Sequence, residues 1–240
     1  MKRSVGISVG ILLACGSWSF GQTNVLSQNA VGYVKVSINE GALAMVSYDF
    51  LDIDGNPTTV SDVIGTQLPL NSRVFLWDAA AQGYIIENFQ SGAKSNPDAW
   101  APDNNPIAPG DGFFIEAATG GASGSYDVFM TGEVPGDNNN SGSTDVAIAA
   151  ALTGGGYPYP ASVDWTSTTL ATGAVLGDRL LLWDAGIQNY DVANFQAGAK
   201  SNPDSWSNPA EVIEPGEGFF YDNTSGGGYT WTEVKPYAFP

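Results

Sequence analysis

The sequence contains no histidine and a single cysteine, Cys15. Histidine-based catalytic triads and metal sites with histidine ligands are therefore excluded. If an N-terminal segment that carries Cys15 is removed, thiol chemistry and disulfide bonds are excluded as well. The sequence also lacks a glycine-rich phosphate loop between a strand and a helix. These absences predict that the protein is not an enzyme, although a carboxylate pair of the glycoside hydrolase type stays open in so acidic a chain.

Basic residues are scarce. The chain has 8 lysines and arginines against 25 aspartates and glutamates, for a formal net charge of -17. A chain of this charge is repelled by nucleic acids and by anionic membranes, so neither is an expected partner. The acidic residues could keep an extracellular protein soluble, or they could hold divalent cations.

The N-terminal apolar run is too short for a stable membrane span, and no other apolar run is long enough to cross a bilayer. The first residues read MKRSVGISVGILLACGSWSFGQ, a basic start followed by a short apolar run and a small-residue cleavage site. This pattern predicts a secretory signal peptide over residues 1–21, with cleavage after Gly21. The alternative is a lipoprotein signal in which Cys15 is lipidated. Either reading predicts a secreted or cell-surface protein without a membrane span.

One stretch of the sequence is written twice. NFQSGAKSNPDAW (residues 88–100) returns as NFQAGAKSNPDSW (residues 194–206), and the gap-free match extends over residues 74–116 and 180–222 with 23 of 43 positions identical. Both copies contain a Leu-Trp-Asp-Ala run and end in Pro-Gly-acid-Gly-Phe-Phe. A repeat of this length predicts a structural unit that is built twice.

Glycine and proline are abundant, at 30 and 14 residues, and aromatic residues make up 12% of the chain. This composition predicts an all-β fold of two tandem, pseudo-symmetric units of about 100 residues each, sandwich-like or barrel-like. The expected organisation is a signal peptide (1–21), a first unit (22–136), a linker (137–145) and a second unit (146–240). The expected strands are residues 73–77, 84–89, 112–117, 126–134, 147–152, 180–183, 190–195, 218–222 and 229–234. Residues 91–109 are expected to hold no regular strand.

The repeated tryptophans and basic residues allow structural and functional interpretations. Trp77 and Trp183 lie within strand-like runs and are expected in the core. Trp100 and Trp206 lie in loops, where they either plug the ends of the units or stack on a ligand such as a polysaccharide. Two further pairs of repeated residues are expected to form ion pairs: Lys94 and Lys200 with Asp98 and Asp204, and Arg73 and Arg179 each with an acidic residue.

A strand-like sequence near the start, GYVKV (residues 32–36), resembles GEVP at residues 132–135 and TEVK at residues 232–235. Three such segments in two units leave two interpretations. One strand is shared at the junction, or one is spare and completes the sheet of a neighbouring molecule. The donor residues in the second case are Val31, Tyr33, Val34 and Val36.

The linker DNNNSGSTD (residues 137–145) resembles the first part of a calcium-binding loop. Its candidate oxygen ligands are Asp137, Asn139, Ser141 and Asp145. The twelfth position of such a loop is normally a bidentate glutamate, and here it is Ile148. Calcium is therefore a candidate cofactor with an incomplete ligand set, and a plain Asn/Gly/Ser linker is the alternative.

Three segments together resemble a group of uncharacterised exported proteins of Verrucomicrobia and their relatives. They are SQNAVGYVKV (residues 27–36), the two Leu-Trp-Asp strands and the two Pro-Gly-acid-Gly-Phe-Phe segments. The resemblance covers nearly the whole mature chain and implies a signal peptide followed by a duplicated β unit. It implies no catalytic or binding residues. The alanine- and glycine-rich start of the second unit (residues 147–156) departs from the pattern.

The sequence leaves two candidate functions open. The first is a secreted structural protein, a surface or filament subunit that self-assembles by donation of its N-terminal strand. The second is a carbohydrate-binding or adhesive extracellular module.

Overall fold

β-strands dominate the described chain. The computed structural model describes residues 30–52, 58–93, 96–120, 124–135, 142–199 and 202–237. Its helical segments are single turns, α1 (Val60–Val63), η1 (Trp165–Ser167) and α2 (Thr169–Thr172). No helix within these ranges is long and apolar enough to cross a bilayer. The all-β fold class predicted from the sequence is confirmed.

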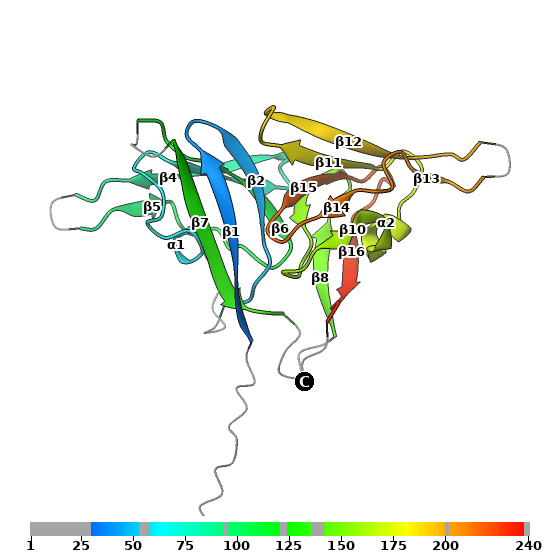
Figure 1. Cartoon of the computed structure of the whole chain (residues 1–240), viewed down its shortest axis with the longest axis horizontal. Helices are drawn as coiled ribbons and strands as arrows, with labels where there is room; N and C mark the ends of the chain where they lie inside the picture. The colour runs from blue at the N-terminus through cyan, green and yellow to red at the C-terminus, as the bar shows by residue number, and fades with distance from the viewer. Residues whose placement is uncertain are drawn as a thin grey trace, which may run out of the picture.

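The first half of the molecule, residues 31–133, combines a two-stranded ribbon with part of a larger sheet (Figure 1). In the ribbon, β1 (Val31–Asn39) pairs antiparallel with β7 (Ser125–Glu133) along all nine residues. The sheet strands follow the order β2-β6-β3-β4-β5. They are β2 (Leu43–Tyr48), β3 (Arg73–Asp78), β4 (Gly83–Gln90), β5 (Ala99–Ala101) and β6 (Asp111–Glu116).

The second half, residues 143–234, repeats this plan. β8 (Ser143–Ile148) forms a ribbon with β16 (Tyr229–Val234), and the sheet strands follow the order β9-β15-β11-β12-β13. These are β9 (Leu152–Gly156), β11 (Arg179–Asp184), β12 (Asn189–Gln196), β13 (Ser205–Trp206) and β15 (Gly218–Asp222). A small extra pair joins β10 (Val163–Asp164) to β14 (Val212–Ile213).

The two halves share one open ten-stranded sheet, with β5 and β13 as its edge strands. At the joint, Asp111 of β6 pairs with Gly155 of β9, and Val46 of β2 pairs with Glu217 next to β15. The two bridges connect equivalent positions of the halves. Such reciprocal contacts are typical of a twofold arrangement. The expected separate units are therefore joined edge to edge through their sheets.

Glycines permit this joint. A Cβ atom at Gly112 would overlap the main chain of Gly155, and one at Gly218 would overlap the carbonyl group of Val46. Glycine disfavours strands, so the sequence LTGGG of β9 does not look like a strand. The segment nevertheless forms a strand, because glycine lets neighbouring backbones approach more closely than any side chain allows.

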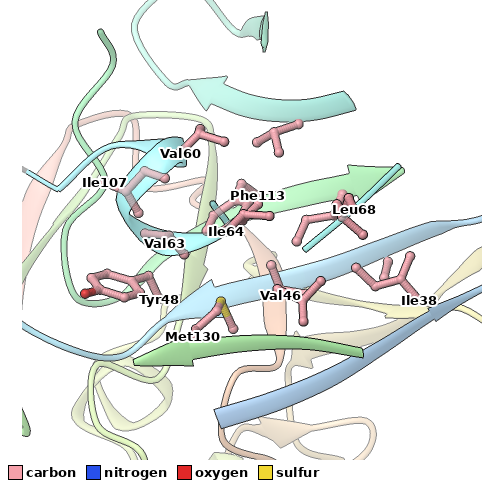
Figure 2. Close-up of a cluster of buried hydrophobic side chains, with 14 of the residues drawn as sticks. Ile38, Val46, Tyr48, Val60, Val63, Ile64, Leu68, Ile107, Phe113 and Met130 are labelled. Carbon is pink, nitrogen blue, oxygen red and sulfur yellow. The ribbon is translucent and has the colours of Figure 1, made fainter. Parts of the chain in front are cut away.

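Each half has its own core between its ribbon and the inner face of the sheet. In the first half, Ile38 and Met130 from the ribbon lie over Val46 and Phe113 from the sheet, with the α1 side chains beside them (Figure 2). The second core includes Trp165, Trp206 and Trp231. Fully burying a large apolar side chain stabilises the fold by about 1.5–3 kcal/mol.

Three local predictions need correction. The segment at residues 147–152 is not one strand, because β8 ends at Ile148 and β9 begins at Leu152. Residues 91–109 contain the short strand β5, which pairs with β4. The second half already begins with β8 at Ser143, inside the expected linker.

Candidate functional site

Aromatic side chains gather on the outer face of the ten-stranded sheet, where its halves meet. Side chains alternate between the faces of a strand, so Val74 and Leu76 enter the first core while Phe75 and Trp77 lie on the outer face. We call the outer set the aromatic cluster. It comprises buried Met45, Phe114 and Phe220 and partly buried Leu43, Phe75, Trp77, Leu152, Leu181, Trp183 and Tyr190.

The repeated tryptophans bind the opposite half of the molecule. The indole N–H of Trp183 donates to the carbonyl oxygen of Leu43, at 2.9 Å, and Trp77 makes the same bond to Leu152, also at 2.9 Å. Both indoles are only partly buried. They were expected in the cores of their own units, and the structure places them at the joint instead, because they lie on the outer face of the sheet.

Two glutamines complete this reciprocal contact. The side chain of Gln188 accepts from the amide of Leu43 at 2.9 Å and donates to its carbonyl oxygen at 3.0 Å. Gln82 brackets Leu152 in the same way, at 3.2 and 2.9 Å. The repeated Leu-Trp-Asp-Ala runs and the glutamines that follow them therefore hold the two halves together.

The aromatic cluster and the exposed ring of Tyr84 line a pocket of about 200 Å³. Its lining is Leu43, Phe75, Tyr84, Phe114, Trp183 and Tyr190. The hydroxyl groups of Tyr84 and Tyr190 lie close enough to influence each other's ionisation. Burial raises the pKa of both phenols above the ordinary tyrosine value, so both are neutral at physiological pH. The pocket wall carries no charge of its own.

Two arginines on the outer face are paired with acidic residues. The Nε of Arg73 donates to Glu116 at 2.7 Å, and that of Arg179 donates to Asp222 at 2.9 Å. The predicted pairing of both arginines with acidic residues is confirmed. The Arg73 guanidinium also lies over the ring of Phe75, 5.2 Å from its centroid.

The second half contains an incomplete copy of this set of rings. Tyr190, Phe220 and Trp77 repeat the rings of Tyr84, Phe114 and Trp183, because the contacts at the joint are reciprocal. The equivalent of Phe75, which pairs with Phe114, is Leu181, which pairs with Phe220. One ring is therefore missing from the second copy.

Sequence reasoning did not identify the pocket residues as a site. A signal was present, since Tyr84 and Tyr190, like Phe114 and Phe220, recur at the same spacing as the tryptophans. The repeat alone could not show that the two copies of the motif meet each other.

Trp100 and Trp206 are 4% and 5% exposed, so they offer no ring face for a polysaccharide to stack on. Their indoles donate to the carbonyl oxygens of Gly65, at 2.7 Å, and Ala171, at 3.1 Å. Each packs on the phenylalanine of its own NFQ motif, Phe89 or Phe195. The ligand-stacking alternative at these two residues is not supported, because burial in the cores uses both rings.

The loops that these tryptophans anchor are closed by aspartates. Asp98 accepts from the amide of Gly92, and Asp204 accepts from Gly198, both at 3.0 Å. Lys94 and Lys200, their expected ion-pair partners, lie outside the described residues.

The candidate calcium ligands Asp137, Asn139 and Ser141 also lie outside the described residues. Asp145 belongs to β8, where it accepts a hydrogen bond from Thr232 at 2.6 Å. Within the described ranges, no cluster of three or more acidic, cysteine or histidine side chains could hold a metal ion.

One buried carboxyl group is hydrogen-bonded to both halves of the molecule. Asp49 is 1% exposed and accepts from Ser47 Oγ at 2.6 Å and from the amide of Gly216, in the other half, at 2.7 Å. Burial raises the pKa of Asp49 to about 8, although both hydrogen bonds lower it. The role of this carboxyl group is structural, because it is enclosed at the joint and bonds to the main chain of the opposite half.

The proposed donor residues Val31, Tyr33, Val34 and Val36 all lie in β1, which is paired with β7 of the same chain. Ala30 accepts from the amide of Val134 at 2.7 Å. Hydrogen-bonded pairs alternate along an antiparallel ladder, so Gly32, Val34 and Val36 bond to β7. The main-chain groups of Val31, Tyr33, Lys35 and Ser37 then point to the other edge, which pairs with no strand in the described part of the chain.

The outer edge of β7, by contrast, is covered. The Gln67 side chain accepts from the amide of Phe129 at 2.8 Å and donates to its carbonyl oxygen at 3.1 Å. Leu51 and Glu133 exchange two main-chain bonds of 2.9 Å. Among the described residues, the ribbon therefore has one closed edge and one open edge.

Comparison with models of known protein families, with curated proteins and with solved structures gives no match.

Proposed function

We propose that the protein is a secreted subunit of an extracellular assembly, in which each copy accepts a strand from a neighbouring copy at the open edge of β1. The open edge is the observation that carries this proposal. Unpaired main-chain groups on a strand are a template for β-augmentation. Because β1 is already paired with β7, it is the accepting strand here, and the donor is the segment that precedes it, residues 22–29.

A groove beside the open edge supports the proposal. It measures about 280 Å³ and is lined by Lys35, Val36 and Ser37 of β1, together with side chains of β2 and of the second half. Its apolar lining includes Ala44, Met45 and Trp183. The proposed donor, QTNVLSQN, carries one apolar pair, Val25-Leu26, between polar residues. An added strand would make main-chain hydrogen bonds to β1 and place these side chains toward the groove.

The experiment measures the size of the mature chain, residues 22–240, by size-exclusion chromatography with light scattering and by electron microscopy. We expect ordered oligomers or fibres. Raising the salt concentration should favour them, because copies without Lys2 and Arg3 carry 6 basic and 25 acidic residues, a net charge of -19, and repel each other. Removal of residues 22–29 should leave a folded monomer.

Two substitutions at one position separate the main chain from the side chain. Tyr33→Pro removes an amide from the open edge but no bond to β7, so it should block assembly. Tyr33→Ser is the control and should still assemble. A mature chain that stays monomeric, or a truncated chain that still polymerises, contradicts the proposal. Parallel samples with calcium and with EDTA test whether the segment from Asp137 to Asp145 contributes.

A further inference from the structure

The aromatic pocket is a cage of five rings. Successive ring centroids lie 6.1 Å apart from Phe75 to Tyr84, 6.3 Å from Tyr84 to Phe114, 5.1 Å from Phe114 to Trp183 and 4.9 Å from Trp183 to Tyr190. Each pair is close to perpendicular, with interplanar angles of 69° to 87°. The hydroxyl groups of Tyr190 and Tyr84 also lie close to each other. Aromatic faces and edges therefore meet the enclosed space from several directions.

The pocket offers a ligand almost no hydrogen bonds. Its lining surface is almost entirely apolar, and the indole N–H of Trp183, one of its few polar groups, is already bonded to Leu43. A sugar or a carboxylate bound here would leave its own polar groups unpaired. A ligand that suits this wall therefore has an apolar surface and no donors or acceptors.

The charge of the protein favours a cation. The net charge of -17 attracts positive ligands over long range. The electron-rich faces of tryptophan, tyrosine and phenylalanine attract cations at short range. Arg73 already lies over the ring of Phe75, and its own charge is compensated by Glu116, so it leaves no net positive charge beside the pocket.

We propose that this pocket binds a quaternary ammonium group, the trimethylated nitrogen of a small soluble compound of the choline type. Such a group is positively charged, has an apolar methyl surface and forms no conventional hydrogen bonds, which matches the wall of the cage. Trp183 lines both this pocket and the groove beside β1, but the pocket's other lining residues do not line the groove, so the two proposals rest on different observations.

The incomplete set of rings in the second half provides an internal control. Leu181 stands where the first half has Phe75, so the second copy has four rings. We expect a single site per chain. Phe75→Leu should convert the complete pocket into the incomplete kind, and Leu181→Phe should do the reverse.

The test is isothermal titration of the full mature chain with choline and with 3,3-dimethylbutan-1-ol, in which a carbon atom replaces the charged nitrogen. We expect choline to bind with a stoichiometry of one and the neutral compound to bind at least tenfold more weakly. Phe75→Leu should weaken choline binding at least fivefold. Leu181→Phe should raise the stoichiometry towards two. Thermal melting curves establish that each variant is folded.

Several results would overturn the proposal. Equal affinity for the neutral compound would mean that the pocket selects apolar shape and not charge. Tighter binding of a neutral disaccharide would assign the pocket to sugars. Binding to phosphatidylcholine vesicles but not to free choline would replace the small soluble ligand with a membrane surface. Absence of choline binding to the folded wild-type chain would exclude the site.

Discussion

The indole of Trp183 donates its only N–H to the carbonyl oxygen of Leu43, 140 residues earlier in the chain, at 2.9 Å. Trp77 donates to Leu152 at the same distance. Each tryptophan belongs to a strand of one half and binds the first sheet strand of the other half. The repeated motif is therefore an interface motif, and the two copies are mutually dependent.

Removal of either indole bond should weaken the joint by a similar amount. We expect Trp183→Phe and Trp77→Phe each to lower the free energy of unfolding by about 1–2 kcal/mol, from a lost hydrogen bond and a smaller ring. Urea denaturation measures this change. A large effect at one tryptophan and none at its counterpart would contradict the reciprocity of the contacts.

Side chains at the glycine joint should disrupt it. Gly218→Ala places a methyl group against the carbonyl of Val46, so we expect a loss of about 1–3 kcal/mol. Gly227→Ala is the matched control, because a Cβ atom there meets nothing within 4 Å. Thermal unfolding compares the two variants. Equal melting temperatures would show that the strands at the joint can move apart without loss of stability.

The buried carboxyl of Asp49 predicts a pH dependence of stability. Its pKa is raised from an ordinary value of 3.8 to about 8 in the folded chain. The contribution of Asp49 is therefore fully present below pH 4 and is lost as the pH rises through 8, because only the unfolded chain ionises in between. The slope is at most about 1.4 kcal/mol per pH unit. Urea denaturation between pH 4 and pH 9 measures it.

Asp49→Asn removes this titration and keeps a side chain that can bond to Ser47 and Gly216. We expect the variant to lose less stability than the wild type as the pH rises. A remaining slope in the same direction is expected from Asp111, whose pKa burial raises to about 6. An unchanged pH profile in the variant would show that Asp49 ionises normally in the folded protein.

Trp100 and Trp206, which the structure places in the short strands β5 and β13, should matter for stability and not for ligand binding. Trp100→Ala removes a buried ring and its bond to Gly65, so we expect a loss of about 3–5 kcal/mol. Tyr33→Ala is an exposed aromatic control and should change stability by less than about 0.5 kcal/mol. Chemical denaturation of both variants tests the difference.

Much of the fold follows from local sequence patterns. The hairpin of β3 and β4 and that of β11 and β12 are readable because β-rich runs flank a turn in both copies of the repeat. The bounds of β15 and β16 match their prediction at both ends. Strong strand propensity and nearby turn residues determine these elements, so their environment in the fold adds little.

The elements that create the joint could not be read locally. β1 pairs with β7, which lies about 90 residues later in the chain. Neither strand's sequence predicts this pairing. The position of β9 was predicted wrongly because its glycines lower strand propensity. These glycines allow the backbones of the two halves to approach closely. Tyr84 and Phe114 could be seen as repeated residues, but a pocket between two copies of a motif exists only once the copies are docked.

Because each half supplies a tryptophan and a glutamine to the other, the peptide link between β7 and β8 is not what holds the halves together. Such a link acts mainly as a high effective concentration of one half for the other. A protease cut within residues 136–141 should therefore leave two fragments that travel as one particle. They would separate only on dilution or in denaturant, as the subunits of a dimer do.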